Sequence, residues 1–306
     1  KWIQAIYQGA RFRHQVAADS ARDWKAVNIL ITGSKGFIGK ELSRYFGEEH
    51  NVIATDRTTL DPTKYESVRH FFDTNDVDIV IHAAVKGGRR GHEENVDVLY
   101  ENILMFENLS KFSDSYKVLF NFGSGAEFDR RGSISSVKEE AVAESLPEDY
   151  YGLSKNLITR KINQIDSNIY NLRLFGCFGI DEESQRLLRA TYYKICNNQN
   201  PTVYGDKFMD YFYAQDVGRV IDYVMNNLEK DIPKDINLCY NKKYKLSDLV
   251  YKIKYLTKSD CDVIIYNNEI GNLSYTGDSA RLDSLNIALS GIDIGVEKCL
   301  KSWKKY

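Results

Sequence analysis

The chain has 306 residues, a length suited to one large or two modest domains with a sizeable core. Its 41 Lys and Arg residues against 43 Asp and Glu residues give a formal charge of −2, so the sequence offers no basic field for nucleic acid or an anionic membrane, and we expect neither partner. No uncharged apolar run approaches the roughly 18 residues of a membrane-spanning helix.

Cysteine and histidine usage argues against disulfides and metal. The five cysteines are scattered, with no Cys-x-x-Cys pair, at positions 177, 196, 239, 261 and 299. This spacing favours a reducing compartment, and we expect a cytoplasmic protein. The five histidines show no metal-ligand spacing, so we expect no metal and look for an organic cofactor.

Residues 1–26 differ in composition from the rest of the chain, with five basic residues against two acidic ones. They are interpreted as an N-terminal extension: a transit-like arm, the end of an upstream domain, an artificial addition or a solvated helix. The extension is left out of the fold prediction.

From residue 27, short apolar runs alternate with segments of helical periodicity. Strands are predicted at 27–31, 51–55, 77–81, 117–122 and 169–175, and helices at 37–46, 65–72, 96–112 and 149–165. Strands that are apolar throughout and alternate with helices indicate a parallel sheet covered on both faces. The sequence therefore predicts an α/β, doubly wound domain over 27–175.

Beyond residue 175 the alternation weakens, although helical periodicity continues at 184–196, 216–228 and 246–256. We expect residues 176–306 to form a smaller mixed substrate-binding region, with some segments returning to the first domain. Such a region would lie over the carboxyl ends of the strands, where open α/β sheets bind ligands.

A glycine turn separates the first strand from the first helix. Gly33, Gly36 and Gly39 have three separate uses: a sharp turn, close approach of a pyrophosphate and close packing of helix on strand. The free N–H groups of the following helix favour the anion. Dinucleotide binding is favoured over a purely structural turn.

Asp56 closes the second strand about twenty residues later, where a carboxylate can bond both hydroxyls of an adenosine ribose. This favours NAD(H). Arg57 follows at once and offers a partner for the 2′-phosphate of NADP(H), so both cofactors are kept.

A Tyr-x-x-x-Lys pair opens the helix between the fourth and fifth strands. Tyr151 and Lys155 lie four residues apart, on one helix face, and Ser124 lies just past the fourth strand. An ammonium about 4 Å from a phenol favours the phenolate by roughly 4 kcal/mol at an effective dielectric near 20. We therefore expect Lys155 to lower the pKa of Tyr151, with Tyr151 as acid/base and Ser124 binding the reacting oxygen.

Together these motifs resemble the extended short-chain dehydrogenase/reductases. Thr32-Gly33-x-x-Gly36-Phe37-x-Gly39, His82-Ala83-Ala84, Asn102, Ser124 and Tyr151-x-x-x-Lys155 carry the resemblance, and three later segments extend it: 210–216, 237–249 and 277–282. The spacing around residues 83–88 is closest to the GDP-fucose synthase type, which reduces 4-keto sugars.

The resemblance implies a Rossmann-type fold, a nucleotide-diphosphate sugar as substrate, Ser124, Tyr151 and Lys155 as catalytic triad, and Lys155 on the nicotinamide ribose. It also implies a homodimer packed through helices near 95–112 and 150–165. Further cofactor contacts are assigned to Phe37, Ile38, Asp61, His82, Ala83 and Ala84. Substrate contacts are assigned to Asn102 and Ser124 and, by charge, to Lys86 and Arg281, with Arg89 and Arg90 as further candidates.

Departures from the family pattern narrow the reaction. Gly125 and Ala126 follow Ser124 where the 4,6-dehydratases carry Asp-Glu, and Ala126 stands where bifunctional fucose synthases carry a cysteine. Pro62, Gly176 and Met209 also depart from residues usual near adenine and the substrate phosphates. The sequence thus predicts reduction of a nucleotide-linked 4-keto sugar in polysaccharide biosynthesis, with a 4-epimerase holding NAD tightly and a non-catalytic nucleotide-binding scaffold or sensor as alternatives.

Overall fold

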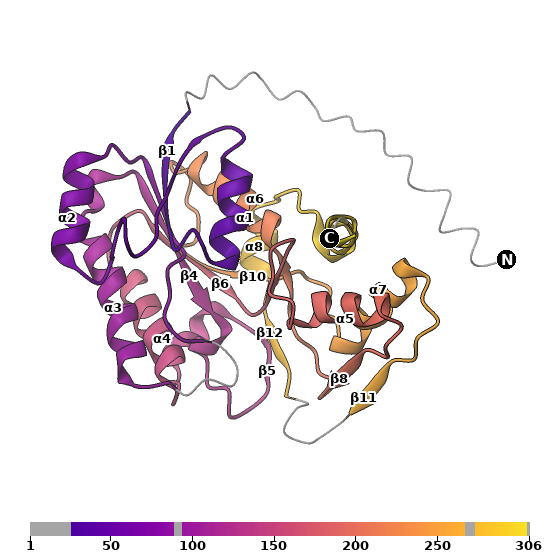
Figure 1. The fold of residues 1–306 in the computed structure, drawn as a ribbon. Helices are drawn as coiled ribbons and strands as arrows, with labels where there is room; N and C mark the ends of the chain where they lie inside the picture. The colour runs from indigo at the N-terminus through magenta and orange to yellow at the C-terminus, as the bar shows by residue number, and fades with distance from the viewer. Residues whose placement is uncertain (1–25, 89–93, 267–272, 305–306) are drawn as a thin grey trace.

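A computed structural model describes residues 26–88, 94–266 and 273–304. Its centre is a six-stranded parallel sheet (Figure 1). In spatial order the strands are β10 (Asp235–Leu238), β6 (Ile169–Leu174), β4 (Val118–Ser124), β3 (Ile79–His82), β1 (Asn28–Thr32) and β2 (Asn51–Ala54). The predicted Rossmann-type, doubly wound class is confirmed.

Two layers of helices cover the sheet because each strand alternates its side chains between the faces. In β1, Ile29 and Ile31 face α1 (Phe37–Phe46) and α6 (Ala214–Met225), whereas Leu30 faces the opposite layer. That second layer consists of α2 (Tyr65–Thr74), α3 (Val96–Ser110) and α4 (Tyr150–Ile162), with α3 and α4 packed side by side (Figure 1).

The elements after β6 divide between the sheet and a smaller lobe. β10 extends the sheet beside β6, although the sequence analysis assigned no strand there, and α6 packs on α1. The smaller lobe has its own apolar core around α5 (Leu187–Cys196), α7 (Leu246–Thr257) and α9 (Gly291–Trp303). Its two-stranded sheet pairs β8 (Thr202–Tyr204) with β11 (Ile264–Tyr266).

Short paired strands join the central sheet to the smaller lobe near the carboxyl ends of the sheet strands. β5 (Ile134–Val137) pairs with β12 (Tyr275–Gly277), and β7 (Cys177–Phe178) pairs with β9 (Phe212–Tyr213). The remaining helices are the 3₁₀ turns η1 (Ser113–Ser115), η2 (Gly125–Glu127) and η3 (Glu139–Ala143) and the short α8 (Ala280–Ser284).

Predicted and observed boundaries differ by at most three residues. The helix predicted to begin at residue 149 begins at Tyr150, because Asp149 is its N-cap and accepts the N–H of Gly152 at 2.7 Å. None of the described helices is long and apolar enough to cross a membrane.

Candidate active site

The glycine turn has the geometry that a pyrophosphate requires. Gly33 has φ +66°, a left-handed conformation that favours glycine, and a Cβ there would lie 2.7 Å from the backbone of Ala84. A Cβ on Gly39 would lie 2.4 Å from the Gly33 carbonyl oxygen, whereas one on Gly36 would have only that oxygen nearby, at 3.3 Å. Gly36 therefore presents an open backbone surface.

The N-terminus of α1 lies directly behind this surface. Gly36 is its N-cap, and no side chain bonds the first N–H groups of the helix. These N–H groups, from Phe37 and Ile38 onward, are available to an anion. The turn thus fits the phosphates of a dinucleotide, and the contacts at Phe37 and Ile38 stay a prediction.

The end of β3 packs against this turn. Thr32 and His82 are paired in neighbouring strands, and the Thr32 hydroxyl lies 2.8 Å from His82 Nδ1. The same hydroxyl oxygen accepts the N–H of Ala84 at 3.3 Å, so it fixes the His82-Ala83-Ala84 segment beside the glycines. Burial lowers the pKa of His82 to about 3, with a further contribution from the Lys155 charge, so the ring is neutral.

Asp56 lies at the end of β2, beside two cations. Its carboxylate pairs with Lys35 of the glycine turn and accepts the N–H of Thr58 at 2.8 Å, and these contacts lower its pKa. Arg57 pairs with Glu101 at 3.2 Å. A ribose hydroxyl must therefore share Asp56 with Lys35, and a 2′-phosphate must compete with Glu101 for Arg57. The choice between NAD(H) and NADP(H) stays open as in the sequence.

Asp61 bonds the chain locally. Its Oδ1 accepts both the N–H of Thr63, at 3.1 Å, and the Thr63 hydroxyl, at 2.6 Å. The carbonyl oxygen of the neighbouring Pro62 accepts the amide of the buried Asn108 at 2.9 Å. An adenine contact by Asp61 stays a prediction.

Ser124, Tyr151 and Lys155 come together at the carboxyl end of β4. Ser124 is the last residue of β4, and its hydroxyl acts on the Tyr151 phenol in the first turn of α4, where it lowers the pKa of that phenol. Lys155 lies one turn further along α4, is 5% exposed, and donates from Nζ to the Phe122 carbonyl oxygen at 2.8 Å. Two segments distant in sequence, the end of β4 and the start of α4, thus bring three groups to the sheet edge where the glycine turn lies.

The prediction that Lys155 lowers the pKa of Tyr151 is wrong. The pKa of Tyr151 is raised, because burial of its hydroxyl outweighs the hydrogen bond from Ser124 and the charge of Arg130. Lys155 Nζ lies 6.0 Å from the centre of the Tyr151 ring and is turned toward β4. Burial also lowers the pKa of Lys155 to about 8, which weakens the cation itself.

Asn102 and Lys86 form one unit beside the triad. The Asn102 amide is 2% exposed, accepts the N–H of Lys86 at 2.9 Å, and donates to the Lys86 carbonyl at 3.0 Å and to Ser154 at 3.1 Å. Asn102 therefore holds the backbone of the loop after β3. The Lys86 ammonium pairs with Glu101, so a phosphate at Lys86 must compete with that carboxylate.

Arg281 lies among acidic side chains. Its guanidinium pairs with Glu140, lies 3.7 Å from Glu139, and donates to the Asp235 carbonyl at 2.8 Å. These contacts tie α8 to η3 and β10, so the charge that suggested a substrate contact is already balanced within the protein. Arg89 and Arg90 lie outside the described residues.

Two residues at this edge were missed in the sequence analysis. Tyr275 lies at the start of β12, and its hydroxyl would lie 2.7 Å from a Cβ on Gly125, the residue after Ser124; the Ser124 hydroxyl also acts on its pKa. Arg130 pairs at 2.6 Å with Asp149, the N-cap of α4, and its charge acts on both phenols. No motif marks either residue: Arg130 lies in the loop after η2, and Tyr275 lies in a strand distant in sequence.

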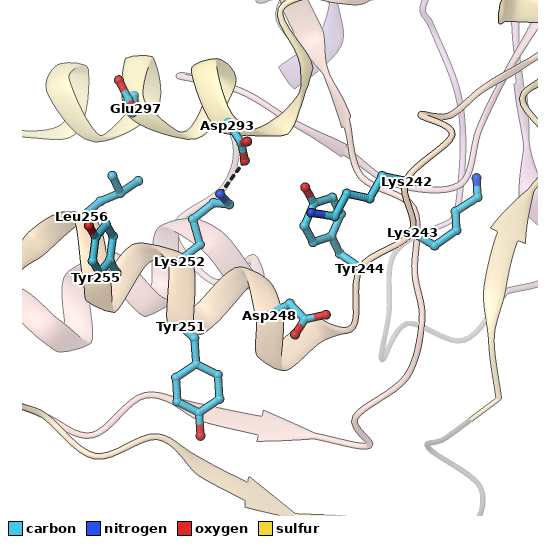
Figure 2. Close-up of a pocket in the computed structure, with 10 residues that line it drawn as sticks. All are labelled: Lys242, Lys243, Tyr244, Asp248, Tyr251, Lys252, Tyr255, Leu256, Asp293 and Glu297. Carbon is cyan, nitrogen blue, oxygen red and sulfur yellow. Dashed lines mark ion pairs between the residues drawn. The ribbon is translucent and has the colours of Figure 1, made fainter. Parts of the chain in front are cut away.

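A separate groove of about 690 Å³ lies on the smaller lobe, between α7 and α9 (Figure 2). Lys252 of α7 pairs with Asp293 of α9 across it, and Lys242 Nζ lies 4.8 Å from the centre of the Tyr244 ring. None of its lining residues comes from the glycine turn, β4 or α4. This groove is therefore distinct from the candidate active site.

Comparison with known proteins agrees with the fold and with the predicted family. Residues 29–239 match the NAD dependent epimerase/dehydratase family. The chain is 24% identical over 250 residues to a GDP-L-colitose synthase of Yersinia pseudotuberculosis, covering 74% of this chain and 80% of that protein. It is 29% identical over 135 residues to a GDP-L-fucose synthase of Sinorhizobium fredii, covering 42% of this chain and 43% of that one.

Among solved structures, a GDP-mannoheptose C4 reductase from Campylobacter jejuni with NADP bound superposes with a TM-score of 0.77 at 20% identity, covering 91% of this chain and 98% of that chain. The Bordetella bronchiseptica enzyme WbmG, in complex with NAD and UDP, gives a TM-score of 0.77 at 17% identity, covering 92% and 95%. At these identities the likeness establishes the fold.

The fold, the glycine turn and the family match define an NAD(P)-dependent oxidoreductase of the extended short-chain dehydrogenase/reductase type. The chain belongs to the NAD dependent epimerase/dehydratase family. The predicted family, enzyme class and nicotinamide cofactor are confirmed.

Proposed function

We propose that this protein reduces the 4-keto group of a nucleotide-diphosphate-linked sugar with NAD(P)H. The observation that carries the proposal is the placement of Ser124 at the end of β4 and Tyr151 in the first turn of α4, where the Ser124 hydroxyl acts on the Tyr151 phenol, with Lys155 buried beside them. Two hydroxyl groups at one point can both bond a carbonyl oxygen. One of them can then give it a proton.

The proton is available because the pKa of Tyr151 is raised, so the phenol is protonated at neutral pH. A protonated phenol suits reduction, where the substrate oxygen gains a proton as its carbon gains a hydride. The bound dinucleotide supplies that hydride. Gly33, Gly36 and the N-terminus of α1 hold its pyrophosphate, and Lys155 is assigned to its ribose.

Other reactions of the family need groups that the site lacks. Gly125 and Ala126 have no proton to move, and Glu127 is fully buried in a bond to Arg173, at 2.7 Å, rather than open to substrate. Dehydration and base-driven 3,5-epimerisation are thus disfavoured. A 4-epimerase needs only transient oxidation and the same phenol, so it is the second candidate.

The substrate class is supported by the relatives, whose names specify GDP-linked sugars, and we place a nucleotide-diphosphate sugar over the triad. Asn102, through the Lys86 backbone, and the Lys86 ammonium are the proposed substrate-side contacts. We place the activity in the cytoplasm, in the biosynthesis of polysaccharide sugars.

We also propose a homodimer packed through α3 and α4. Tyr100 is 65% exposed, Val96 56% and Leu157 38%, so these two adjacent helices expose apolar side chains. Burying such a surface against a second copy is favourable. Light scattering on the purified protein tests this, and a monomer contradicts it.

The experiment for the activity follows oxidation of NADPH and of NADH with GDP-linked 4-keto sugars, with product identification by mass spectrometry. A reductase consumes the reduced cofactor in proportion to product. A protein that retains NAD through purification and interconverts 4-epimers without added cofactor supports the epimerase. Binding of nucleotide with no conversion of any sugar supports the scaffold or sensor.

A further inference from the structure

A buried cluster of charged side chains is hydrogen-bonded to the backbone of Ser124. Arg173 of β6 is fully buried; it donates from Nε to Glu127 at 2.7 Å and from Nη2 to Asp235 of β10 at 2.8 Å. Both carboxylates are also buried, at 0% and 2% exposure. Arg173 makes a third bond from Nη1 to Asn237 at 2.9 Å, so each of its three guanidinium nitrogens has an acceptor inside the protein.

Glu127 links this cluster to the reaction centre. Its Oε1 accepts the N–H of Ser124 at 2.7 Å, while the Ser124 hydroxyl oxygen accepts the N–H of Ala126 at 3.2 Å. The two bonds form a capping box at the start of η2. Gly123 permits the close approach, because a Cβ there would lie 2.4 Å from the same carboxylate oxygen.

The second carboxylate oxygen of Glu127 faces away from the site. Oε2 accepts from the Thr159 hydroxyl of α4 at 2.9 Å as well as from Arg173. Glu127 therefore has bonding partners in β4, α4 and β6, the elements that carry or flank the triad. Because its oxygens are occupied in this way, it acts on the reaction through Ser124 and not as a base.

We propose that Glu127, anchored by Arg173, is the positioning residue that sets the Ser124 hydroxyl against the substrate oxygen. The inference rests on the proposed function. Stability alone is a weak reason for such a cluster, because well-packed apolar residues often replace a buried ion pair without loss. Orientation of a reacting group is a stronger one, because a displacement of about 1 Å can cost about 100-fold in rate.

Two matched variants separate positioning from stability. Glu127→Gln and Asp235→Asn each remove one carboxylate from Arg173, but only the first touches Ser124. In Glu127→Gln, the amide cannot accept from both Ser124 and Arg173, because one of its ends is now a donor. We expect both variants to lose comparable thermal stability.

The expected kinetic result is a fall in kcat of about 100-fold for Glu127→Gln, with the KM for the 4-keto sugar and the affinity for NADPH within about threefold of wild type. We expect Asp235→Asn to retain kcat within about threefold. An equal loss of kcat in the two variants overturns the proposal, because a purely structural cluster predicts that result.

A readout without turnover uses the Ser124 amide signal in nuclear magnetic resonance. Carbonyl-labelled glycine with nitrogen-labelled serine selects the Gly–Ser steps at 33–34, 123–124 and 132–133, and Ser124→Ala identifies the middle one. The signal must shift in Glu127→Gln and stay in place in Asp235→Asn. An unmoved signal overturns the proposal. If the wild type converts no sugar, the proposed function fails, while this signal still reports on Ser124.

A third variant covers the case in which Glu127→Gln does not fold. Combining Glu127→Gln, Arg173→Met and Asp235→Asn removes every charge of the cluster, so the Gln oxygen can accept from Ser124 while its NH₂ faces Thr159. We expect kcat within about tenfold of wild type. A folded triple variant with kcat reduced about 100-fold contradicts the role given to the Ser124 bond.

Discussion

The glycine turn allows cofactor binding and folding to be separated by single substitutions. Gly36 has φ −75°, which alanine adopts without strain, and its Cβ would meet only the Gly33 oxygen, at 3.3 Å. Replacing glycine by alanine in a compatible conformation stabilises by about 0.4–1 kcal/mol through the unfolded state. We therefore expect Gly36→Ala to change the free energy of unfolding by less than about 1 kcal/mol.

The same substitution places a methyl group on the surface that a pyrophosphate must approach. We expect the affinity for NADPH and for NADH to fall at least about tenfold, which is about 1.4 kcal/mol, and Gly36→Val to bind still more weakly. Titration of nucleotide fluorescence measures the affinity, and urea unfolding measures the stability.

Gly39→Ala is the matched control, because its Cβ would lie 2.4 Å from the Gly33 oxygen and 2.7 Å from Ser34 Cα. Overpacking of this kind costs about 1–3 kcal/mol, so this variant should lose stability. Wild-type affinity in a folded Gly36→Ala or Gly36→Val protein would refute the placement of the pyrophosphate at this turn.

Three further predictions concern titration and proton transfer. Tyr151→Phe should lower kcat at least about 100-fold while NADPH affinity stays within a few-fold, and unchanged turnover would exclude Tyr151 as the proton donor. The pKa of His82 is about 3 in the folded protein and 6.5 in the unfolded chain, so the free energy of unfolding should fall by up to about 4 kcal/mol as the pH drops from 6.5 to 3. Urea unfolding of His82→Gln should show a smaller fall, and an equal fall contradicts the prediction. The pKa of Lys155 is about 8 in the folded protein and 10.5 in the unfolded chain, so the unfolded chain binds more protons between these pH values. The free energy of unfolding should therefore rise by up to about 3 kcal/mol as the pH increases from 8 to 10.5. Lys155→Met should lack that rise, and a rise that persists would show that another group causes it.

The sequence alone determined five of the six strands of the parallel sheet, and it predicts that ligands bind beyond their carboxyl ends. Strands such as Ile79–His82 are buried along their whole length, and that burial appears in sequence as unbroken apolar runs between helical periods. The glycine turn and the Tyr-x-x-x-Lys pair were readable because each is local: three glycines around one turn, and two residues on one helix face. Local geometry of this kind depends on spacing, which sequence shows directly.

Only the tertiary structure decided the electrostatics of the site and the partners of its residues. Lys155 lies on the expected helix face, yet its ammonium bonds the Phe122 carbonyl, and burial raises the pKa of Tyr151 where spacing suggested a fall. Charge alone predicts a substrate contact for Arg281, whereas the fold places Glu139 and Glu140 beside its guanidinium.

Glu127 combines a feature that the sequence shows with one that only the tertiary structure shows. Ser124-x-x-Glu127 is a capping signature that the sequence displays, and a charged Arg173 inside an apolar strand requires a buried acid. The sequence does not show that one carboxylate both caps η2 and pairs with Arg173, because residues 127 and 173 meet only when β4 and β6 pair. Desolvation and charge pairing depend on which segments meet in space, and that is a property of the whole fold.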